Sequence, residues 1–129
     1  MGKIVIKSTE MPREDTASAM IKWFCNAFDL DADIEAKLLM KFIEAARKNK
    51  AISSSELKIS GVARSTIIYH LNRFIDYGLV VRKGRKYIFR GPNMESAIEE
   101  IEYDIDRELK KMLAFAKELD KQIEDNHKR

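Results

Sequence analysis

Hydrophobic positions recur every three or four residues in four stretches of the chain, the spacing of helices with one buried face. They predict a first helix that begins near Pro12 and a second from about Asp33 to Lys48. A third is expected from about Arg64 to Tyr77, and a long last one from Asn93 to about Asp125. The expected buried residues of the first three are Ala17, Met20, Ile21, Phe24 and Phe28; Ile34, Leu38, Leu39, Phe42, Ile43 and Ala46; and Ile67, Leu71, Phe74 and Ile75.

The stretch "AISSSELKIS", between the second and third predicted helices, carries the pattern of a helix start. Ser53 is followed three residues later by Glu56, the spacing of a capping box in which each side chain bonds a backbone N–H of the other. We therefore expect a short helix from about Ser54 to Ile59, ended by a turn at Ser60 and Gly61. A short helix, a tight turn and a longer helix form a helix-turn-helix.

Two short runs rich in β-branched and aromatic residues, "LVVR" and "KYIF", follow the third predicted helix. Gly78 is expected to end that helix in the left-handed conformation. Lys83-Gly84-Arg85, between the two runs, predicts a hairpin turn in which glycine supplies any positive φ. Near the N-terminus, "KIVIK" predicts a short strand or an ordered arm. The fold class expected is mainly α with a small β-hairpin.

The last predicted helix has a seven-residue apolar repeat, the signature of a coiled coil. At about 1.5 Å per residue it would span about 50 Å, which is longer than a small domain can cover. We expect the same helix of a second copy to cover it, which makes the protein a homodimer; a helix folded back on its own domain is the alternative. The repeat is imperfect near its start, where Glu102 occupies a position that an apolar residue would fill. Its two series are Ile98, Ile105, Met112 and Leu119, and Leu109, Ala116 and Ile123.

Charge is unevenly placed along the chain, although the net charge is only +3. Residues 61–90 carry seven basic side chains and one acid, Asp76, whereas residues 91–129 carry seven basic and eleven acidic side chains. A basic segment joined to an acidic one is typical of a module that binds a polyanion, attached to a part that does not touch it. For a helix-turn-helix, that polyanion is double-stranded DNA.

Length and composition narrow the classes further. A chain of 129 residues fits one domain with an appended arm. No apolar run approaches the roughly 18 residues of a membrane helix, and the first residues are too charged for a signal peptide. We therefore expect a cytoplasmic protein with no membrane partner.

Residues that could carry chemistry are few. Cys25 is the only cysteine, and Cys25, His70 and His127 fall on separate elements, so we expect neither a metal nor a cofactor. Cys25 is expected to be a small buried hydrophobe, with a redox switch across a dimer as the alternative, and His70 to sit at the edge of the core. No phosphate-binding loop and no catalytic triad can be assembled, so we expect no enzyme.

The stretch "GVARSTIIYHLNRFIDYGLVVRKGRKYIF" resembles the winged helix-turn-helix of the ArsR and MarR-like transcriptional regulators, especially the small archaeal ones. The resemblance covers about Ile34 to Arg90. Ala63 stands where the family usually has a serine cap. Ile68 stands where the family usually has a small polar residue that faces the groove. It could contact a thymine methyl group in place of a hydrogen bond to a base. The matching residues are Ser65, Thr66, Tyr69, His70, Leu71, Gly78, Leu79 and Val80.

The resemblance implies roles for two sets of residues. A recognition helix in the major groove would use Arg64, Ser65, Thr66, Ile68, Tyr69 and Arg73. A basic wing on the backbone or minor groove would use Arg82, Lys83, Arg85 and Lys86. The chain would divide into an N-terminal arm and helix that support the dimer (1–30), the winged helix-turn-helix (31–91) and a coiled-coil dimerisation helix (92–129).

We therefore expect a homodimeric, sequence-specific DNA-binding transcriptional regulator. One alternative is a chromosome-associated protein of the same fold that binds DNA with little sequence preference. Another is an adaptor whose winged helix binds a protein. A hydrophobic effector pocket between the first and last helices also stays open.

Overall fold

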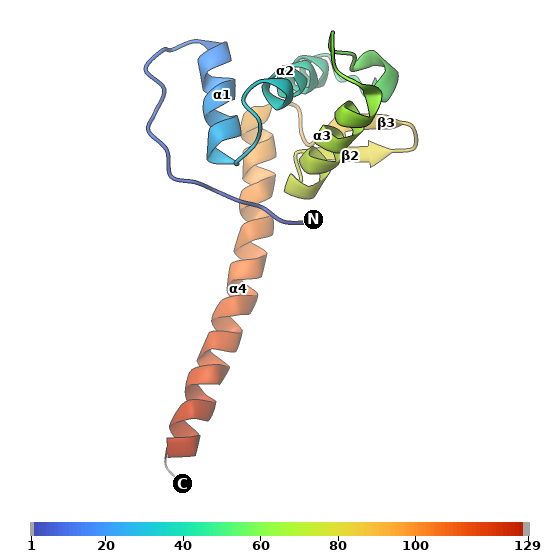
Figure 1. The fold of residues 1–129 in the computed structure, drawn as a ribbon. Coiled ribbons are helices and arrows are strands. Elements are labelled where there is room, and N and C mark those ends of the chain that lie inside the picture. The colour runs from blue at the N-terminus through green and yellow to red at the C-terminus, as the bar shows by residue number, and fades with distance from the viewer. Residues whose placement is uncertain (1, 128–129) are drawn as a thin grey trace.

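The computed structural model describes residues 2–127. Three helices and a small sheet gather around the first part of a much longer last helix, whose second part projects away from them (Figure 1). We call the gathered elements the body. The elements are, in chain order, α1 (Ala17–Ala27), α2 (Ile34–Arg47), β1 (Ile52–Ser53), the 3₁₀ turn η1 (Ser54–Glu56), α3 (Arg64–Tyr77), β2 (Val80–Lys83), β3 (Lys86–Phe89) and α4 (Met94–His127).

The predicted start of the first helix near Pro12 is wrong, because α1 begins at Ala17. The Thr16 side chain accepts a hydrogen bond from the Ala19 N–H at 3.2 Å. A side chain that caps the first turn satisfies a backbone donor that would otherwise lack a partner, and nothing at Pro12 does this. The helix therefore starts where it can be capped.

The residues before α1 form an extended arm and no strand, so of the two alternatives for "KIVIK" the ordered arm is confirmed. The Lys7 N–H donates to the Ala27 carbonyl at 2.6 Å, and the Trp23 indole N–H donates to the Glu10 carbonyl at 2.9 Å. The arm crosses in front of α4 on its way to α1 (Figure 1). These two hydrogen bonds hold the arm to the second half of α1.

The predicted short helix over Ser54–Ile59 is instead the single turn η1. The Ser53 hydroxyl donates to the Glu56 carboxylate at 3.1 Å, and Ser53 makes no side-chain cap to the backbone. The expected capping box is therefore not formed. The turn begins at Ser54 as predicted and ends at Glu56, three residues early, where Leu57 enters the core.

α2 and α3 confirm the predicted boundaries within a residue and supply most of the core. Their fully buried side chains interlock between them, and the rings of Phe42 and Phe74 meet edge to face with centroids 6.1 Å apart. η1 and β2 close the same core with Leu57, Leu79 and Val80. The core residues of the two helices are Leu38, Leu39, Phe42, Ile67, Leu71, Phe74 and Tyr77.

The sheet has three antiparallel strands in the order β1-β3-β2. β2 and β3 form the predicted hairpin, in register from Val80 opposite Phe89 to Lys83 opposite Lys86. Gly84 in its loop has a φ of +63°, as the turn prediction required. β1, which was not predicted, adds the third strand beside β3.

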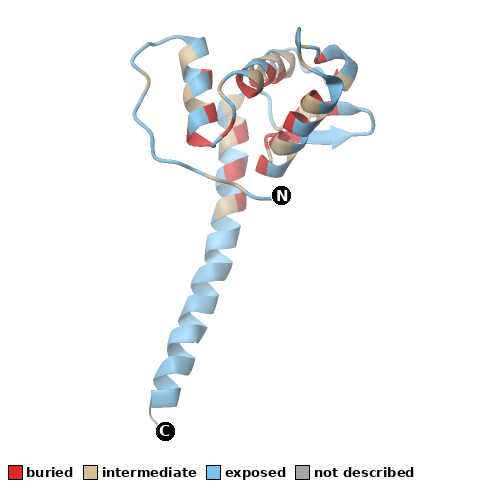
Figure 2. Cartoon of the chain, in the orientation of Figure 1, coloured by how far each residue is buried: buried red, intermediate tan, exposed pale blue. Residues whose placement is uncertain are grey.

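α4 belongs to the body only in its first part. Asn93 caps it as predicted, accepting a hydrogen bond from the Ser96 N–H at 2.8 Å. Ala97 and Ile101 are buried in the core, whereas every residue from Asp106 to His127 is exposed, as the pale blue half of the helix in Figure 2 shows. The helix is therefore not folded back on its own domain. No helix within residues 2–127 is long and apolar enough to cross a membrane.

Two residues expected in the seam between copies pack inside the chain instead. Ile98 and Ile105 are half-buried against the core of their own body. Ile98 and Ile105 lie on the same face of α4 as Ile101. In the first part of α4, the body therefore covers the face that carries the repeat. The repeat is free only from Leu109 onward.

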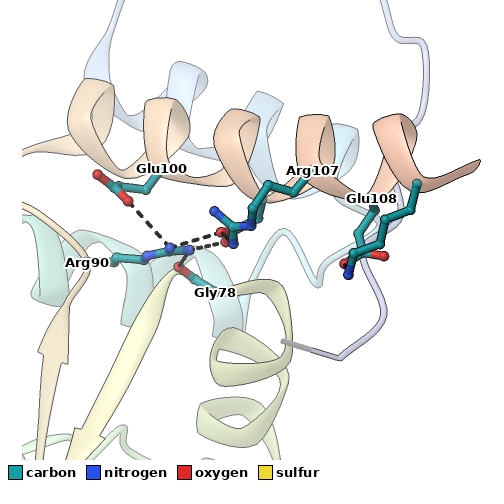
Figure 3. A network of polar contacts seen from close by, with 7 residues as sticks. Gly78, Arg90, Glu100, Arg107 and Glu108 are labelled. Carbon is teal, nitrogen blue, oxygen red and sulfur yellow. Dashed lines mark hydrogen bonds and ion pairs between the residues drawn. The ribbon is translucent and has the colours of Figure 1, made fainter. Parts of the chain in front are cut away.

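A polar network around the buried Asp104 joins α3, the sheet and α4 (Figure 3). Arg90, just after β3, forms an ion pair with the buried Asp104 of α4, and its other contacts are the Glu100 carboxylate at 3.5 Å and the Gly78 carbonyl at 3.4 Å. Arg107 adds a second cation 2.6 Å from Asp104. Gly78 ends α3 at a φ of +78°, as predicted, and a Cβ there would lie 2.9 Å from the Arg90 guanidinium. The positive φ favours glycine, and a side chain there would displace the Arg90 guanidinium.

Replacing Asp104 with asparagine is expected to lower the free energy of unfolding by about 2–3 kcal/mol at pH 7, because it leaves Arg90 without its charged partner. Hydrogen bonds from Arg90 lower the pKa of the Asp104 carboxyl, and Arg107 adds to the effect although burial opposes it. The difference between wild type and variant should therefore persist at neutral pH. It should shrink as pH falls below the ordinary carboxyl value of 3.8, where the wild-type carboxylate takes up its proton.

Urea unfolding at several pH values measures this. Glu99→Gln, an exposed change on the same helix, is the control and should leave the free energy of unfolding unchanged. Equal stability of wild type and Asp104→Asn at pH 7 would mean that the network does not hold α4 to the sheet.

Candidate nucleic-acid interface

α3 presents one face to solvent and buries the other. Ser65, Tyr69, Asn72 and Asp76 are exposed, and their spacing of four, three and four residues places them in one stripe along the helix. Arg64 is exposed at the start of that stripe. Of the recognition-helix residues predicted, Arg64, Ser65 and Tyr69 therefore lie on this face.

Thr66 and Ile68 lie at its margin, because both are half-buried. Ile68 packs against the core of the body. Part of its side chain is consequently inaccessible to a thymine methyl group, the contact that the sequence suggested for it.

Asn72 was missed by the sequence reasoning although it shares the exposed stripe. It follows Ser65 by seven residues and Tyr69 by three, a spacing that would have placed it there. A side-chain amide can donate to and accept from one adenine edge at once, so Asn72 has the chemistry of a base-reading residue.

The N-terminus of α3 has no side-chain cap, as expected from Ala63 at that position. Arg64, the first residue of the helix, extends its guanidinium toward η1, where one nitrogen lies 3.4 Å from the Ser54 hydroxyl. The first-turn N–H groups and the Arg64 cation therefore share one exposed end of the helix. Both favour an anion at this end.

Arg73, the remaining predicted recognition-helix residue, is half-buried beside Tyr69, 6.0 Å from its ring centroid, and pairs with an acid. Its Nε lies 3.1 and 3.2 Å from the two carboxylate oxygens of Glu35 on α2, and it also donates to the Asp29 carbonyl at 2.9 Å. Glu35 is buried, with 1% of its surface exposed, and needs a cation. Burial lowers the pKa of the Arg73 guanidinium, but the charge of Glu35, the hydrogen bond to it and the contact with Tyr69 together raise that pKa above its ordinary value. This arginine ties α3 to α2.

His70 and Cys25 lie beside the same buried carboxylate. His70 is at the core edge, as expected, and its Nδ1 is 3.4 Å from a Glu35 oxygen without hydrogen-bond geometry. Cys25 has no exposed surface, and burial, together with the charge of Glu35, raises its pKa to about 12. The thiolate needed for redox chemistry is therefore strongly disfavoured.

The β2–β3 hairpin carries four exposed cations and no acid. The Arg82 guanidinium folds over the hairpin, 5.9 Å from the Tyr87 ring centroid, with its Nε donating to the Gly84 carbonyl at 3.0 Å. No ion pair holds any of the four within residues 2–127. The hairpin lies beside α3 and points away from α4 (Figure 1). The four cations are Arg82, Lys83, Arg85 and Lys86.

No group of three His, Cys, Asp or Glu side chains is placed to hold a metal ion within residues 2–127. A cavity of about 830 Å³ lies between α1 and α2. A smaller groove of about 320 Å³ lies between the arm, Phe28 at the end of α1, and α4, near the place where an effector pocket was considered. Neither includes a residue of the α3 stripe or the hairpin.

No protein-family model, no curated protein sequence and no solved structure matches this chain.

Replacing Arg73 with glutamine is expected to lower the free energy of unfolding by about 3 kcal/mol, because it leaves the Glu35 carboxylate buried without its cation. The matched control is Arg82→Gln, which makes the same chemical change on the exposed hairpin and should alter stability by less than about 0.5 kcal/mol. Urea unfolding of both variants decides the matter. An unaltered stability for Arg73→Gln would mean that Arg73 does not stabilise the buried Glu35.

Proposed function

We propose that the body is a winged helix-turn-helix that binds double-stranded DNA, and that the protein acts as a homodimeric, sequence-specific transcriptional regulator. α3 would be the recognition helix and the β2–β3 hairpin the wing. The first helix of the motif would be η1, which is only one turn long. The exposed stripe of α3 would enter the major groove, and the wing would lie along the phosphate backbone or in the minor groove.

The observation that best supports the proposal is that two surfaces of different chemistry, the α3 stripe and the β2–β3 hairpin, lie next to each other. The α3 stripe offers side chains that can hydrogen-bond base edges, while the hairpin next to it offers four cations without acidic neighbours. Base contacts specify a DNA sequence and phosphate contacts position the protein on it. A DNA-reading module needs both on one side, and this body has them on adjacent elements.

Within this proposal the exposed residues divide the work. Ser65, Tyr69 and Asn72 would face bases. Arg64, at the end of the helix, would reach either a guanine or a phosphate, since its planar guanidinium suits both. Lys83, Arg85 and Lys86 would neutralise phosphates and release condensed counterions.

The dimer is supported by the free part of α4. Leu109, Met112 and Leu119 are more than half exposed at 55%, 65% and 58% of their surface, in a repeat that a second helix could cover. Exposed apolar stripes of this length mark interaction sites. Two bodies held together would let one protein read two half-sites on DNA.

A sequence-tolerant chromosome-associated protein is the second candidate, because the hairpin cations alone would give strong binding without base readout. It predicts equal, salt-sensitive affinity for any duplex. Titration of the DNA upstream of the protein's own gene against an unrelated duplex of equal length separates the two. A preference of about 10³-fold or more supports the specific regulator.

Replacing the four wing cations with alanine is expected to weaken DNA binding strongly while leaving the fold intact. At about 0.1 M salt, each cation withdrawn from a phosphate lowers the affinity roughly eightfold, so two or more such cations lower it at least about 50-fold. The slope of log affinity against log salt should become shallower by about 0.9 for each of them. Fluorescence anisotropy with a labelled duplex at several salt concentrations measures both quantities.

The matched control replaces four lysines of α4, Lys110, Lys111, Lys117 and Lys121, with alanine. It removes the same charge from the part of the chain that is not proposed to touch DNA. The two variants should differ clearly in affinity. If both bind like wild type, the protein is not a DNA reader and the adaptor interpretation takes its place.

A chain that ends at Glu108 is expected to fold and to be monomeric, because it keeps every buried residue and loses the exposed stripe. A cut at Arg90 would be unsuitable because it removes Ala97 and Ile101 from the core. Sedimentation of the shortened and full-length chains at one concentration measures the difference. Leu119→Glu in the full-length chain should weaken the dimer in the same way, and a shortened chain that stays dimeric would place the interface elsewhere.

A further inference from the structure

One apolar stripe runs along α4 from the body to its far end. Its residues follow one another at intervals of four, four, three, four, three and four, which keeps them on one face of the helix. The stripe begins at Ile101, which is 3% exposed in the core, and passes Ile105 at the edge of the body before it emerges into solvent. Its members are Ile101, Ile105, Leu109, Met112, Ala116, Leu119 and Ile123.

This continuity constrains how a second helix can be accommodated. A partner helix that covers Met112 and Leu119 must lie on the same side of α4 as the body does. Followed toward the N-terminus of α4, it reaches Ile105 and then meets the body, which already covers Ile101. The partner helix must therefore end there or turn away.

A parallel pair does not satisfy this condition. In a parallel, in-register pair the first halves of both helices lie side by side, so each helix would occupy the face that the other's body covers. Both bodies would also sit at the same end, between the two helices. Packed interiors have no room for such an overlap, so the helices would have to splay apart and leave the stripe uncovered.

We propose that two copies of this chain pair through the exposed part of α4 in antiparallel orientation, the end of each helix meeting the body of the other. This inference rests on the homodimer of the proposed function and adds the direction of its helices. The two bodies then lie at opposite ends of the paired helices. Neither obstructs the stripe.

The lengths agree with this arrangement. The exposed part of α4, from Asp106 to His127, is 22 residues and therefore about 33 Å long. If Ala116 of each copy lies at the centre, Leu109 lies level with Ile123 of the other copy, because each is seven residues from Ala116. His127 then comes level with Ile105, where the body begins. The whole exposed stripe is covered.

The body has an apolar surface where the partner's helix would end. The groove of about 320 Å³ between the arm and α4 lies at this junction, and Ile6 beside it is 64% exposed. Phe28 and Ile105 contribute to the same groove, which continues into Leu109. The apolar surface of the pair would therefore extend from the paired helices onto the arm of each body.

Charge supports the same direction. Residues 106–114 of α4 carry three cations and two acids, whereas residues 115–127 carry two cations and four acids. Antiparallel pairing sets the first segment of one copy against the second segment of the other, so segments of opposite sign meet. Parallel pairing would set like against like at both ends, which is unfavourable.

Single cysteine substitutions can report the direction. Cys25 stays in place, since it has no exposed surface and does not react. Leu109→Cys, Ala116→Cys and Ile123→Cys put a thiol at the start, centre and end of the exposed stripe, at positions outside the core of the body. Ala114→Cys, on the opposite exposed face, is the control. Each full-length variant is treated with a short bis-maleimide, after sedimentation has established its oligomeric state.

The antiparallel pair predicts that Ala116→Cys links to itself. Leu109→Cys and Ile123→Cys alone should not, because two copies of either thiol lie about 21 Å apart along the axis. A mixture of Leu109→Cys and Ile123→Cys should link, and Ala114→Cys should stay unlinked.

Self-linking of Leu109→Cys and of Ile123→Cys in a dimeric protein would overturn the antiparallel direction and leave the homodimer standing. A monomeric full-length chain would overturn both. DNA affinity is measured separately with the wing variants, so failure of DNA binding alters neither result.

Discussion

The ion pair between Arg90 and Asp104 fixes where α4 leaves the body. A carboxylate as buried as Asp104, with 3% of its surface exposed, costs several kcal/mol unless a cation reaches it, so the helix is stable only where Arg90 can meet it. Arg90 comes from the end of β3 and also contacts the Gly78 carbonyl at the end of α3. One guanidinium therefore sets the projecting helix relative to both the proposed recognition helix and the proposed wing. In the proposed function it would link the direction of DNA binding to that of dimerisation.

Arginines of this chain serve two purposes, and their partners separate them. Arg73 and Arg90 each hold a buried carboxylate from another helix, Glu35 and Asp104 respectively. The cations of the β2–β3 hairpin meet no acid within residues 2–127 and remain in water, where Coulomb attraction to a phosphate is open to them. Both kinds look alike in a sequence, because a basic residue on a helix or a hairpin carries no sign of the acid that lies across from it. The proposed wing therefore consists of cations that the fold leaves without an acidic partner.

The heptad repeat of α4 likewise serves two purposes. Its first members complete the core of the body, and the later ones leave it with most of their surface in solvent. The spacing of apolar residues predicts that a face of the helix is covered, but it does not identify what covers that face. Because the body and the proposed partner share one face, the direction of the partner helix follows from sterics, and the interface extends the core rather than lying beside it.

The sequence by itself determined the features that depend on local periodicity and on turn residues. It predicted α2 and α3 within a residue, the caps at Gly78 and Asn93, the hairpin with its glycine turn, and a last helix too long for one body. Tertiary structure decided the rest, because that depends on residues far apart in the chain. Ile52 and Ser53 paired with β3 as an unpredicted third strand, the buried Glu35 gave Arg73 an acidic partner, and exposure added Asn72 to the candidate interface. Local pattern fixes which face a side chain occupies, and only the packed fold decides what that face meets.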